Sequence, residues 1–275
     1  MIERKPVPDR FKDKVTIVTG GSNGIGRSIV EELCKEGCSV AFTGISDAGV
    51  TTQKEMLDAG WDVLFRQGDM SDENFCKEVV ESTLNKWHKV NYLVNNAFSF
   101  TAKGLDATRE DWERIFMVGP VGYAVMVQNV TEPMKEQGGG AIVNMSSISA
   151  FIAQPNRWTY NAAKGAVNTM TKCMALDLAP FNIRVNSVSP AWIWTREVYK
   201  AADLDGGGRE KWDPIWGKFH MLRRCGEPVE CAGPTLFMLS DDASFVTGTD
   251  LAICGGYQAM GPEGLGEASS FASSE

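Results

Sequence analysis

The sequence predicts a single α/β domain, a doubly wound parallel sheet flanked by helices on both faces. Two observations carry this prediction. Short, apolar, β-branched runs alternate with longer stretches of helical periodicity over most of the 275 residues, and a glycine-rich turn follows the first of those runs. Alternation of this kind implies right-handed crossover connections, which cover a parallel sheet with helices on both of its faces.

The expected strands are the short apolar runs at residues 14–19, 39–43, 63–66, 91–95, 141–145, 183–188 and 250–253. Helical patterns fill the intervals between them, at about 25–33, up to 59, 72–87, 109–137, 159–179 and 232–239, with Ser71 as the expected N-cap of the third helix. Residues 1–260 are expected to form one domain with a substrate-lid segment at about 191–226. Residues 261–275, rich in Gly, Ser, Ala and Glu, are expected to form a flexible tail.

Composition excludes several classes of protein. The formal net charge of -8 makes a nucleic-acid or anionic-membrane surface a poor expectation. The polar N-terminus lacks the apolar stretch of a signal peptide, and no run is long enough to span a membrane. We therefore expect a cytoplasmic protein that binds neither nucleic acid nor membrane.

Cysteine and histidine usage gives no sign of a metal site. Only 2 histidines are present, and neither a paired Cys/His spacing nor an HExxH run occurs. The 7 cysteines are an odd number without a CxxC pair, so free thiols in a reducing compartment are expected. Bridges between Cys34 and Cys38, or between Cys225 and Cys231, are the alternative.

The glycine-rich turn, TGGSNGIG at residues 19–26, lies where a strand ends and a helix begins. Small residues there allow backbone N–H groups to approach a pyrophosphate, and the helix N-terminus adds a partial positive charge. In this position the turn is typical of a Rossmann-type dinucleotide site. A P-loop at residues 21–28 is the rival interpretation, but Arg27 stands where its lysine belongs.

Tyr160 and Lys164 are four residues apart on an expected helix, so both lie on one face. An ammonium beside a phenol favours the phenolate and lowers the phenol pKa from about 10. Such a tyrosine can donate or accept a proton near neutral pH. Taken alone, the spacing is more typical of an ordinary helix surface; together with the glycine turn it indicates catalysis.

At this point the chain resembles the classical short-chain dehydrogenase/reductase family over residues 11–257. The matching motifs are TGGSNGIG at 19–26, Asp69, NNA at 95–97, NMSS at 144–147, YNAAK at 160–164, and IRVNSVSP at 183–190 followed by Thr195. The resemblance implies an NAD(P)-dependent oxidoreductase that interconverts a secondary alcohol and a ketone by hydride transfer. It also implies a homodimer or homotetramer, built from the two long helices and the last strand.

The resemblance assigns roles by position. Tyr160 would exchange the proton, Lys164 would hold the nicotinamide ribose and lower the tyrosine pKa, and Ser147 would bond the reacting oxygen; a turn cap is the plainer reading of Ser147. Asn95 would serve the sheet edge and the cofactor. The implied cofactor contacts are Thr19, Gly20, Ser22, Asn23, Gly24, Ile25, Gly26, Asp69, Met70, Asn96, Ala97, Tyr160, Lys164, Pro190, Ile193 and Thr195.

Three positions depart from the family pattern. Phe98 replaces a glycine after NNA, so a bulky ring is expected beside the cofactor or substrate cleft, and Ala191 replaces another glycine. Gly119, followed by Pro120, stands where the family carries an asparagine that anchors a proton-relay water. Since a proline kinks a helix and frees a carbonyl, a backbone carbonyl near Gly119 is expected to hold that water instead.

The choice of cofactor is left open between NAD and NADP, with a slight preference for NADP. The second strand ends in Thr43-Gly44-Ile45-Ser46, without the acid that would accept ribose hydroxyls and repel a 2′-phosphate. Neither Asn23 nor Ile45, however, supplies an arginine that would bind that phosphate.

The lid segment carries four tryptophans with several cationic residues, a mixture suited to polyols, sugar acids or aromatic rings. We expect a sugar-like or other polar secondary alcohol as substrate, with contacts from Phe98, Trp192 and Trp194; the tryptophans could equally pack the lid onto the body. The alternatives are a hydrophobic keto substrate of steroid or 3-oxoacyl type, and a catalytically weakened dinucleotide-binding regulator. We also expect that the tail reaches a neighbouring subunit's cleft.

Overall fold

The computed structural model describes residues 2–266. Seven strands form one sheet in the order β3-β2-β1-β4-β5-β6-β7, and every neighbouring pair is parallel. The strands are β1 Val15–Val18, β2 Ser39–Gly44, β3 Val63–Gln67, β4 Tyr92–Asn95, β5 Gly140–Met145, β6 Ile183–Pro190 and β7 Asp250–Ile253. The predicted doubly wound α/β fold is thereby confirmed.

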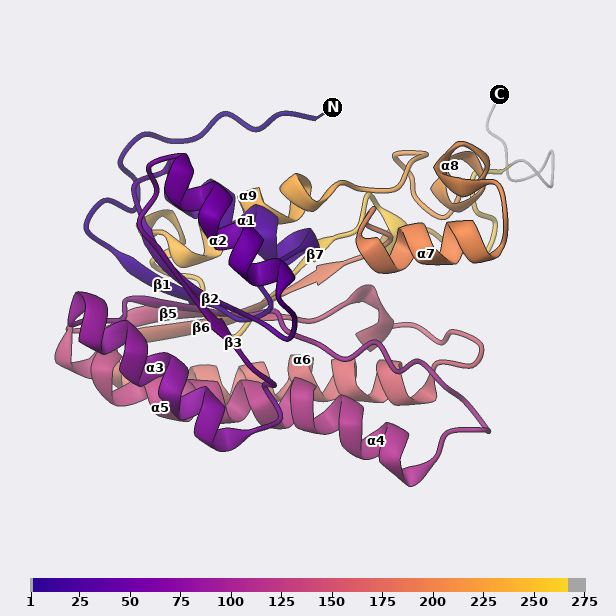
Figure 1. Cartoon of the computed structure of the whole chain (residues 1–275). Helices are drawn as coiled ribbons and strands as arrows, with labels where there is room; N and C mark the ends of the chain where they lie inside the picture. The colour runs from indigo at the N-terminus through magenta and orange to yellow at the C-terminus, as the bar shows by residue number, and fades with distance from the viewer. Residues whose placement is uncertain (1, 267–275) are drawn as a thin grey trace.

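Helices cover both faces of this sheet (Figure 1). One face carries α1 and α2 with α9, and the other carries α3, α5 and α6. Helices α7 and α8 contact each other and cover neither face of the sheet. The helices are α1 Gly24–Lys35, α2 Ala48–Asp58, α3 Glu73–Trp87, α4 Arg109–Phe116, α5 Gly122–Glu136, α6 Trp158–Leu178, α7 Arg196–Leu204, α8 Gly208–Gly217 and α9 Pro228–Leu239.

Alternating side chains of the strands form two separate cores. Val18 packs with Val40 and Val94 of the neighbouring strands against α1 and α9, whereas Ile17 faces α3, α5 and α6. The same alternation divides Val94 from Leu93. Because successive side chains point to opposite faces of a strand, a run that is apolar at every position is what a sheet buried on both faces requires.

Two features of the helices differ from the sequence-based expectation. Asp72, and not Ser71, is the N-cap of α3, since its carboxylate accepts the N–H groups of Asn74 and Phe75. Ser71 instead donates its hydroxyl to Asp69, at 2.9 Å. The lid segment also contains two helices, α7 and α8, that no clear apolar periodicity had indicated.

The expected long helix at 109–137 is interrupted at its centre. A π-helical turn, Met117–Val121, separates α4 from α5 and contains Pro120. Because proline has no N–H, the normal helical bond at that position cannot form, and the wider turn accommodates this loss. The N–H of Gly122 bonds the carbonyls of both Gly119 and Met117. The Gly119 and Met117 carbonyls thus each accept a bond within the helix, and a relay water on a backbone carbonyl near Gly119 stays a prediction.

All seven cysteines are free, and only Cys173 is exposed, so neither of the two alternative bridges forms. Between residues 2 and 266, no group of three or more His, Cys, Asp or Glu side chains is placed to hold a metal ion. Within the same range, no helix is both long and apolar enough to cross a membrane. The expected tail lies mostly outside the described residues, because the description ends at residue 266.

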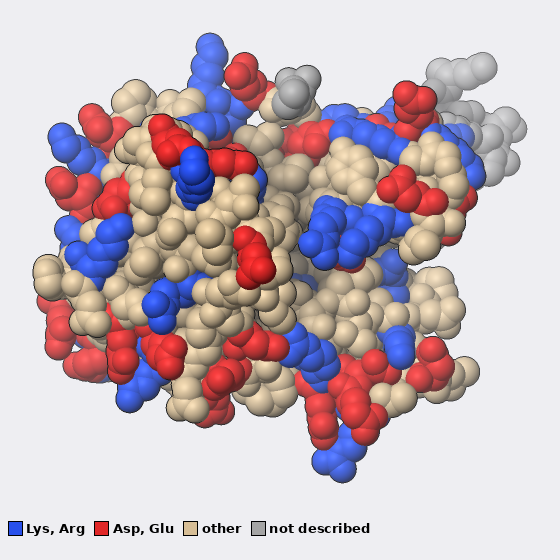
Figure 2. Space-filling view, in the orientation of Figure 1, with Lys and Arg blue, Asp and Glu red and all other residues tan. Residues whose placement is uncertain are grey.

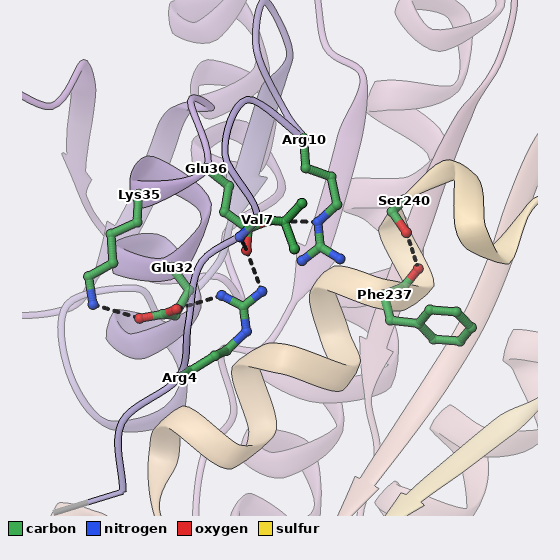
Figure 3. Close-up of polar contacts among 8 residues, drawn as sticks. All are labelled: Arg4, Val7, Arg10, Glu32, Lys35, Glu36, Phe237 and Ser240. Atoms are coloured by element: carbon green, nitrogen blue, oxygen red, sulfur yellow. Dashed lines mark hydrogen bonds and ion pairs between the residues drawn. The ribbon is translucent and has the colours of Figure 1, made fainter.

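A buried ionic network fastens the N-terminal segment to α1 (Figure 3). The Glu36 side chain is fully buried and pairs with Arg4 and Arg10, while Glu32 bonds Arg4 at 2.6 Å and Lys35 at 2.6 Å. The backbone N–H of Val7 also donates to Glu36, at 2.9 Å. Glu36 therefore has several donors around one carboxylate, as a buried charge requires.

We predict that Glu36→Gln lowers the free energy of unfolding by roughly 2–3 kcal/mol, somewhat less than the loss typical of a fully buried pair, because both arginines keep some solvent exposure. Chemical denaturation measures the change. Glu55→Gln is the matched control, since Glu55 pairs with Arg27 on the surface and is 52% exposed. Equal losses in the two variants would contradict a structural role for the buried network.

Candidate active site

The glycine-rich turn connects β1 to α1 and approaches the segment that follows β4. Gly20 and Gly24 adopt positive φ angles of 68° and 55°, which favour glycine. A side chain at Gly20 would place its Cβ 2.9 Å from the Cα of Ala97, and one at Gly26 would overlap the Gly20 carbonyl. The turn can therefore take this shape only with glycine at these positions.

Thr19 and Asn96 hold the turn against the loop after β4. The Thr19 hydroxyl accepts the N–H groups of Asn96 and Ala97, at 2.9 and 3.0 Å. The Asn96 amide returns bonds to the carbonyls of Thr19 and Gly20, at 3.0 and 3.1 Å. Thr19 is buried and does not line the cavity described below. Its position therefore fits a residue that holds the turn in place and does not favour the predicted direct contact with the cofactor.

The N-terminus of α1, where this turn ends, has no side-chain cap from its N-cap residue. Its N-cap, Asn23, is extended and makes no capping bond through its side chain. The first N–H groups of α1 therefore have no side-chain acceptor, although Asn23 and Gly24 line an open cavity. A helix N-terminus of this kind binds phosphate, so these residues fit the pyrophosphate of a dinucleotide.

One cavity of about 540 Å³ joins this turn to the predicted catalytic side chains. In Figure 2 the molecule is hollowed beside the lid, with basic side chains over α7 at the rim. Of the predicted site residues, those that line the cavity are Gly20, Ser22, Asn23, Gly24, Ile25, Gly26, Asp69, Met70, Asn96, Ala97, Phe98, Ser147, Tyr160, Lys164, Pro190, Trp192, Ile193 and Thr195.

Trp194 and Asn95 lie elsewhere. Trp194 is 2% exposed, packs with Trp216 and Ala202, and donates its indole N–H to Asp213 at 2.7 Å. The expectation that it touches substrate is therefore corrected: it packs the lid. Asn95 is fully buried and donates its amide to Asn144 at 2.9 Å, so it links β4 to β5 and does not reach the cavity.

Ser147 combines two roles that the sequence set against each other. It is the N-cap of the short 3₁₀ helix Ile148–Ala150, because its hydroxyl oxygen accepts the Ser149 N–H at 3.2 Å. The same hydroxyl lines the cavity and donates to the Ser149 hydroxyl at 3.2 Å or to the Pro190 carbonyl at 3.5 Å. The cap therefore holds Ser147 at the wall of the cavity that Tyr160 also lines.

Tyr160 and Lys164 lie in surroundings that oppose their charged forms. Burial raises the pKa of the Tyr160 phenol above its ordinary value, against the lowering effects of the Ser147 hydrogen bond and the Arg157 charge. Burial also places the pKa of Lys164 well below its usual range. The Lys164 ammonium does not lower the tyrosine pKa here, contrary to the expectation from their spacing, because it points to a different partner.

That partner is the carbonyl of Met145 together with the ring of Phe98. Lys164 Nζ donates to the Met145 oxygen at 2.7 Å and lies 3.5 Å from the centroid of the Phe98 ring. The centroid of the Tyr160 ring is 5.8 Å away. The lysine is thus fixed at the floor of the cavity with a single polar contact.

Four residues at the Tyr160 end of the cavity were not predicted: Phe100, Ser149, Gln154 and Arg157. Phe100 lies 5.1 Å from the Tyr160 ring, and Arg157 lies over Phe100 at 5.5 Å. Ser149 donates to Gln154 at 2.7 Å. Only Arg157 had a usable signal in the sequence, since it precedes Tyr160 by three residues and so approaches the same face of α6.

At the opposite end, Asp69 is held by an ion pair that the sequence did not indicate. Arg114, from α4, donates to the Asp69 carboxylate at 2.6 Å and also lines the cavity. The pKa of Asp69 lies below its ordinary value: burial raises it, but bonds from Ser71 and Arg114 outweigh that effect. The carboxylate therefore stays charged and fixed where the cavity passes the end of β3.

Fold and site together are typical of a dinucleotide-dependent oxidoreductase, with Ser147, Tyr160 and Lys164 lining the same cavity as the glycine-rich turn. The family model described as enoyl-(acyl carrier protein) reductase matches residues 20–258. The chain is 37% identical over 252 residues to cyclopentanol dehydrogenase of Comamonas testosteroni, covering 91% of this chain and 99% of that protein. It is 37% identical over 258 residues to the NADP-dependent (R)-specific alcohol dehydrogenase of Lentilactobacillus kefiri, covering 92% and 99%.

Among solved structures, the ligand-free aldohexose dehydrogenase of Thermoplasma acidophilum has a TM-score of 0.85 and 34% identity, covering 93% of this chain and 98% of that one. The chain therefore belongs to the short-chain dehydrogenase/reductase family, as its motifs predicted. It is an NAD(P)-dependent enzyme that interconverts alcohol and carbonyl groups.

We predict that Gly26→Ala weakens dinucleotide binding by more than about tenfold, because the new Cβ would approach the Asn96 amide nitrogen to 2.5 Å and displace the turn. Titration of tryptophan fluorescence with NADP and NAD measures the dissociation constants. Gly165→Ala is the matched control, since a Cβ there meets nothing within 4 Å. A turn that does not bind the cofactor would leave both variants equal to the unsubstituted protein.

Proposed function

We propose that this protein oxidises a ring-bearing, polar secondary alcohol to its ketone, or reduces that ketone, with a nicotinamide dinucleotide. The observation that supports it is one cavity lined both by the N-terminus of α1, which the Asn23 side chain does not cap, and by Ser147, Tyr160 and Lys164. The bound dinucleotide would supply or accept the hydride. The residues of the chain would bind it, orient the substrate and move the proton.

The proton step would take place at the Tyr160 oxygen. In the direction of reduction the phenol donates its proton to the carbonyl oxygen, and in oxidation the phenolate accepts it from the alcohol. The Ser147 hydroxyl, which lines the same cavity, would bond the same substrate oxygen and fix its distance from Tyr160. Lys164 would hold the ribose from the floor of the cavity.

The neighbours of Tyr160 favour a ring with polar substituents. Phe98, Phe100 and Trp192 supply flat apolar faces, and Arg157 and Gln154 supply hydrogen bonds on the same wall. Arg157 has no acidic partner among residues 2–266, so its guanidinium is available to an electronegative group. The names cyclopentanol dehydrogenase and aldohexose dehydrogenase belong to relatives whose substrates are also rings.

For the cofactor, we propose that both NAD and NADP bind, with a slight preference for NADP. The cavity at the end of β2 is lined by Gly44, Ile45 and Ser46, none of which would repel a 2′-phosphate. Positions 23 and 45 carry no arginine to attract it, and the Thr43 hydroxyl already accepts the Gly20 N–H at 3.0 Å. Parallel kinetics with the two dinucleotides decide the ratio.

We further propose that the chain is a homodimer or homotetramer assembled through its long helices and last strand. Leu176 on α6 and Phe245, shortly before β7, are large apolar side chains that are 76% and 103% exposed. Apolar groups of this size in the open are typical of surfaces that another subunit covers.

We predict that Tyr160→Phe lowers kcat/KM by about 10²- to 10⁴-fold in both directions while the dissociation constant of the dinucleotide stays unchanged. In the unsubstituted enzyme, oxidation should accelerate as pH rises, because it needs the phenolate, and reduction should slow. The variant should lose both dependences. Absorbance at 340 nm follows the reaction. Tyr92→Phe, in the core beside Phe11, is the control, and a pH profile unaltered by Tyr160→Phe would refute the assignment.

We predict that Arg157→Gln raises KM for polyol and sugar-acid substrates by about 10- to 100-fold, the loss of one charged hydrogen bond, and leaves KM for an unsubstituted cyclic alcohol nearly unchanged. Arg109→Gln is the control, since Arg109 pairs with Glu113 on the exposed side of α4.

Faster turnover of steroid or 3-oxoacyl ketones than of every polar ring would favour the hydrophobic alternative. Dinucleotide binding with no turnover on the whole panel would favour a regulatory protein.

A further inference from the structure

The ammonium of Lys164 is buried without a compensating charge. Lys164 is 2% exposed, and among residues 2–266 the only polar contact of its ammonium is with the Met145 carbonyl. No acidic residue opposes the burial that lowers the Lys164 pKa. A buried ammonium needs a partner, and the nearest remaining group is an aromatic ring.

That ring is Phe98, and it is held from three sides. Its centroid is 5.7 Å from the Tyr160 ring and 6.2 Å from the Tyr123 ring, at interplanar angles of 82° and 75°. On the third side lies Gly119, in the π-helical turn. A Cβ at Gly119 would lie 2.5 Å from Cε2 and 2.9 Å from Cζ of Phe98, well inside van der Waals contact. The ring therefore fits only because position 119 has no side chain.

We propose that Phe98 is a positioning residue for Lys164: its π-face holds the ammonium at the cavity floor, and Gly119 is glycine because the ring occupies the space beside it. The proposal rests on the proposed function. The two departures from the family pattern, at positions 98 and 119, become one matched pair. The ring also fills the space between Lys164 and the π-helical turn, so a water chain cannot leave the ammonium in that direction.

Few titratable groups could confuse a pH measurement at this position. Tyr160 and Arg157 face the site from α6 itself, and Tyr123 faces it from α5, behind the Phe98 ring. Strand β5 contributes the Met145 carbonyl, and the loop after it contributes the hydroxyls of Ser146 and Ser147, none of which titrates in this range. A change in the ionisation of Lys164 can therefore be assigned to its ring contact.

The first experiment replaces the ring by an aliphatic group of similar size. In Phe98→Leu we expect the pKa of Lys164, followed by nitrogen NMR of labelled lysine in the whole protein, to fall by about one pH unit, because the π-face no longer favours the ammonium. The lysine titration tests the ring contact by itself, because Phe98 also lines the substrate cavity and its replacement is expected to alter KM as well.

Phe100→Leu is the matched control. Phe100 also contacts the Tyr160 ring, at 5.1 Å, yet no contact with Lys164 is described for it. We expect this variant to alter KM and to leave the lysine titration in place. If Phe98 were only a wall of the substrate cavity, the two variants would behave alike, and that result would overturn the proposal.

The second experiment tests the pairing with Gly119. Gly119→Ala alone should displace the ring, lower the melting temperature and reduce kcat/KM by at least about tenfold. In a Phe98→Ala background the same substitution should change kcat/KM by less than about twofold and leave the melting temperature unchanged. An equal loss in both backgrounds would mean that the backbone of the π-helical turn requires glycine, and the pairing would be wrong.

The lysine titration and the melting temperature do not require turnover. An inactive protein that still passes both tests would contradict the proposed function and leave the Phe98 pairing intact. An active protein whose lysine titration is indifferent to Phe98→Leu would contradict the pairing alone.

Discussion

The site depends on the junction between β1 and β4, where the order of strands reverses. Chain connections leave the sheet in opposite directions from these two neighbours, and a crevice opens between them at the carboxyl edge. The Thr19 hydroxyl closes the base of that crevice by accepting two backbone N–H groups from the β4 side. Every later feature of the cofactor site, including the orientation of the α1 N-terminus, follows from this junction.

The chemistry then depends on how burial is balanced along the cavity. At the β3 end, Asp69 and Arg114 form an ion pair, so charge is kept in place. At the catalytic end no acidic residue between 2 and 266 pairs with Lys164: the ammonium is buried, the Tyr160 phenol is half-buried, and burial pushes each toward its neutral form. Polar groups of a bound dinucleotide and substrate would stabilise the charged forms that burial disfavours. Proton transfer is therefore expected mainly when both ligands are bound.

The sheet and the glycine turn could be predicted because they follow from patterns local in sequence. A short run that is apolar at successive positions, such as Ile17 and Val18, already indicates a strand buried on both faces, and the structure places these two side chains in different cores. The N-cap of α3 could not be predicted to the residue, since Ser71 and Asp72 are both favourable N-cap residues. In the structure the Ser71 hydroxyl bonds Asp69, which leaves Asp72 as the N-cap. Helix α8 was hidden because its tryptophans pack in a small cluster of their own and do not form a regular apolar stripe.

The roles of individual site residues were predictable only where the contact is local. The Ser147 cap and the helix face shared by Tyr160 and Lys164 are fixed by neighbours within four residues. The direction of the Lys164 ammonium is set by Phe98, 66 positions earlier in the chain, and the position of Phe98 is set in turn by Gly119. Sequence comparison marks positions 98 and 119 as separate losses from a family pattern. Packing joins them, because removing one side chain makes the space that the other fills, and the same volume cannot hold both an asparagine and the ring.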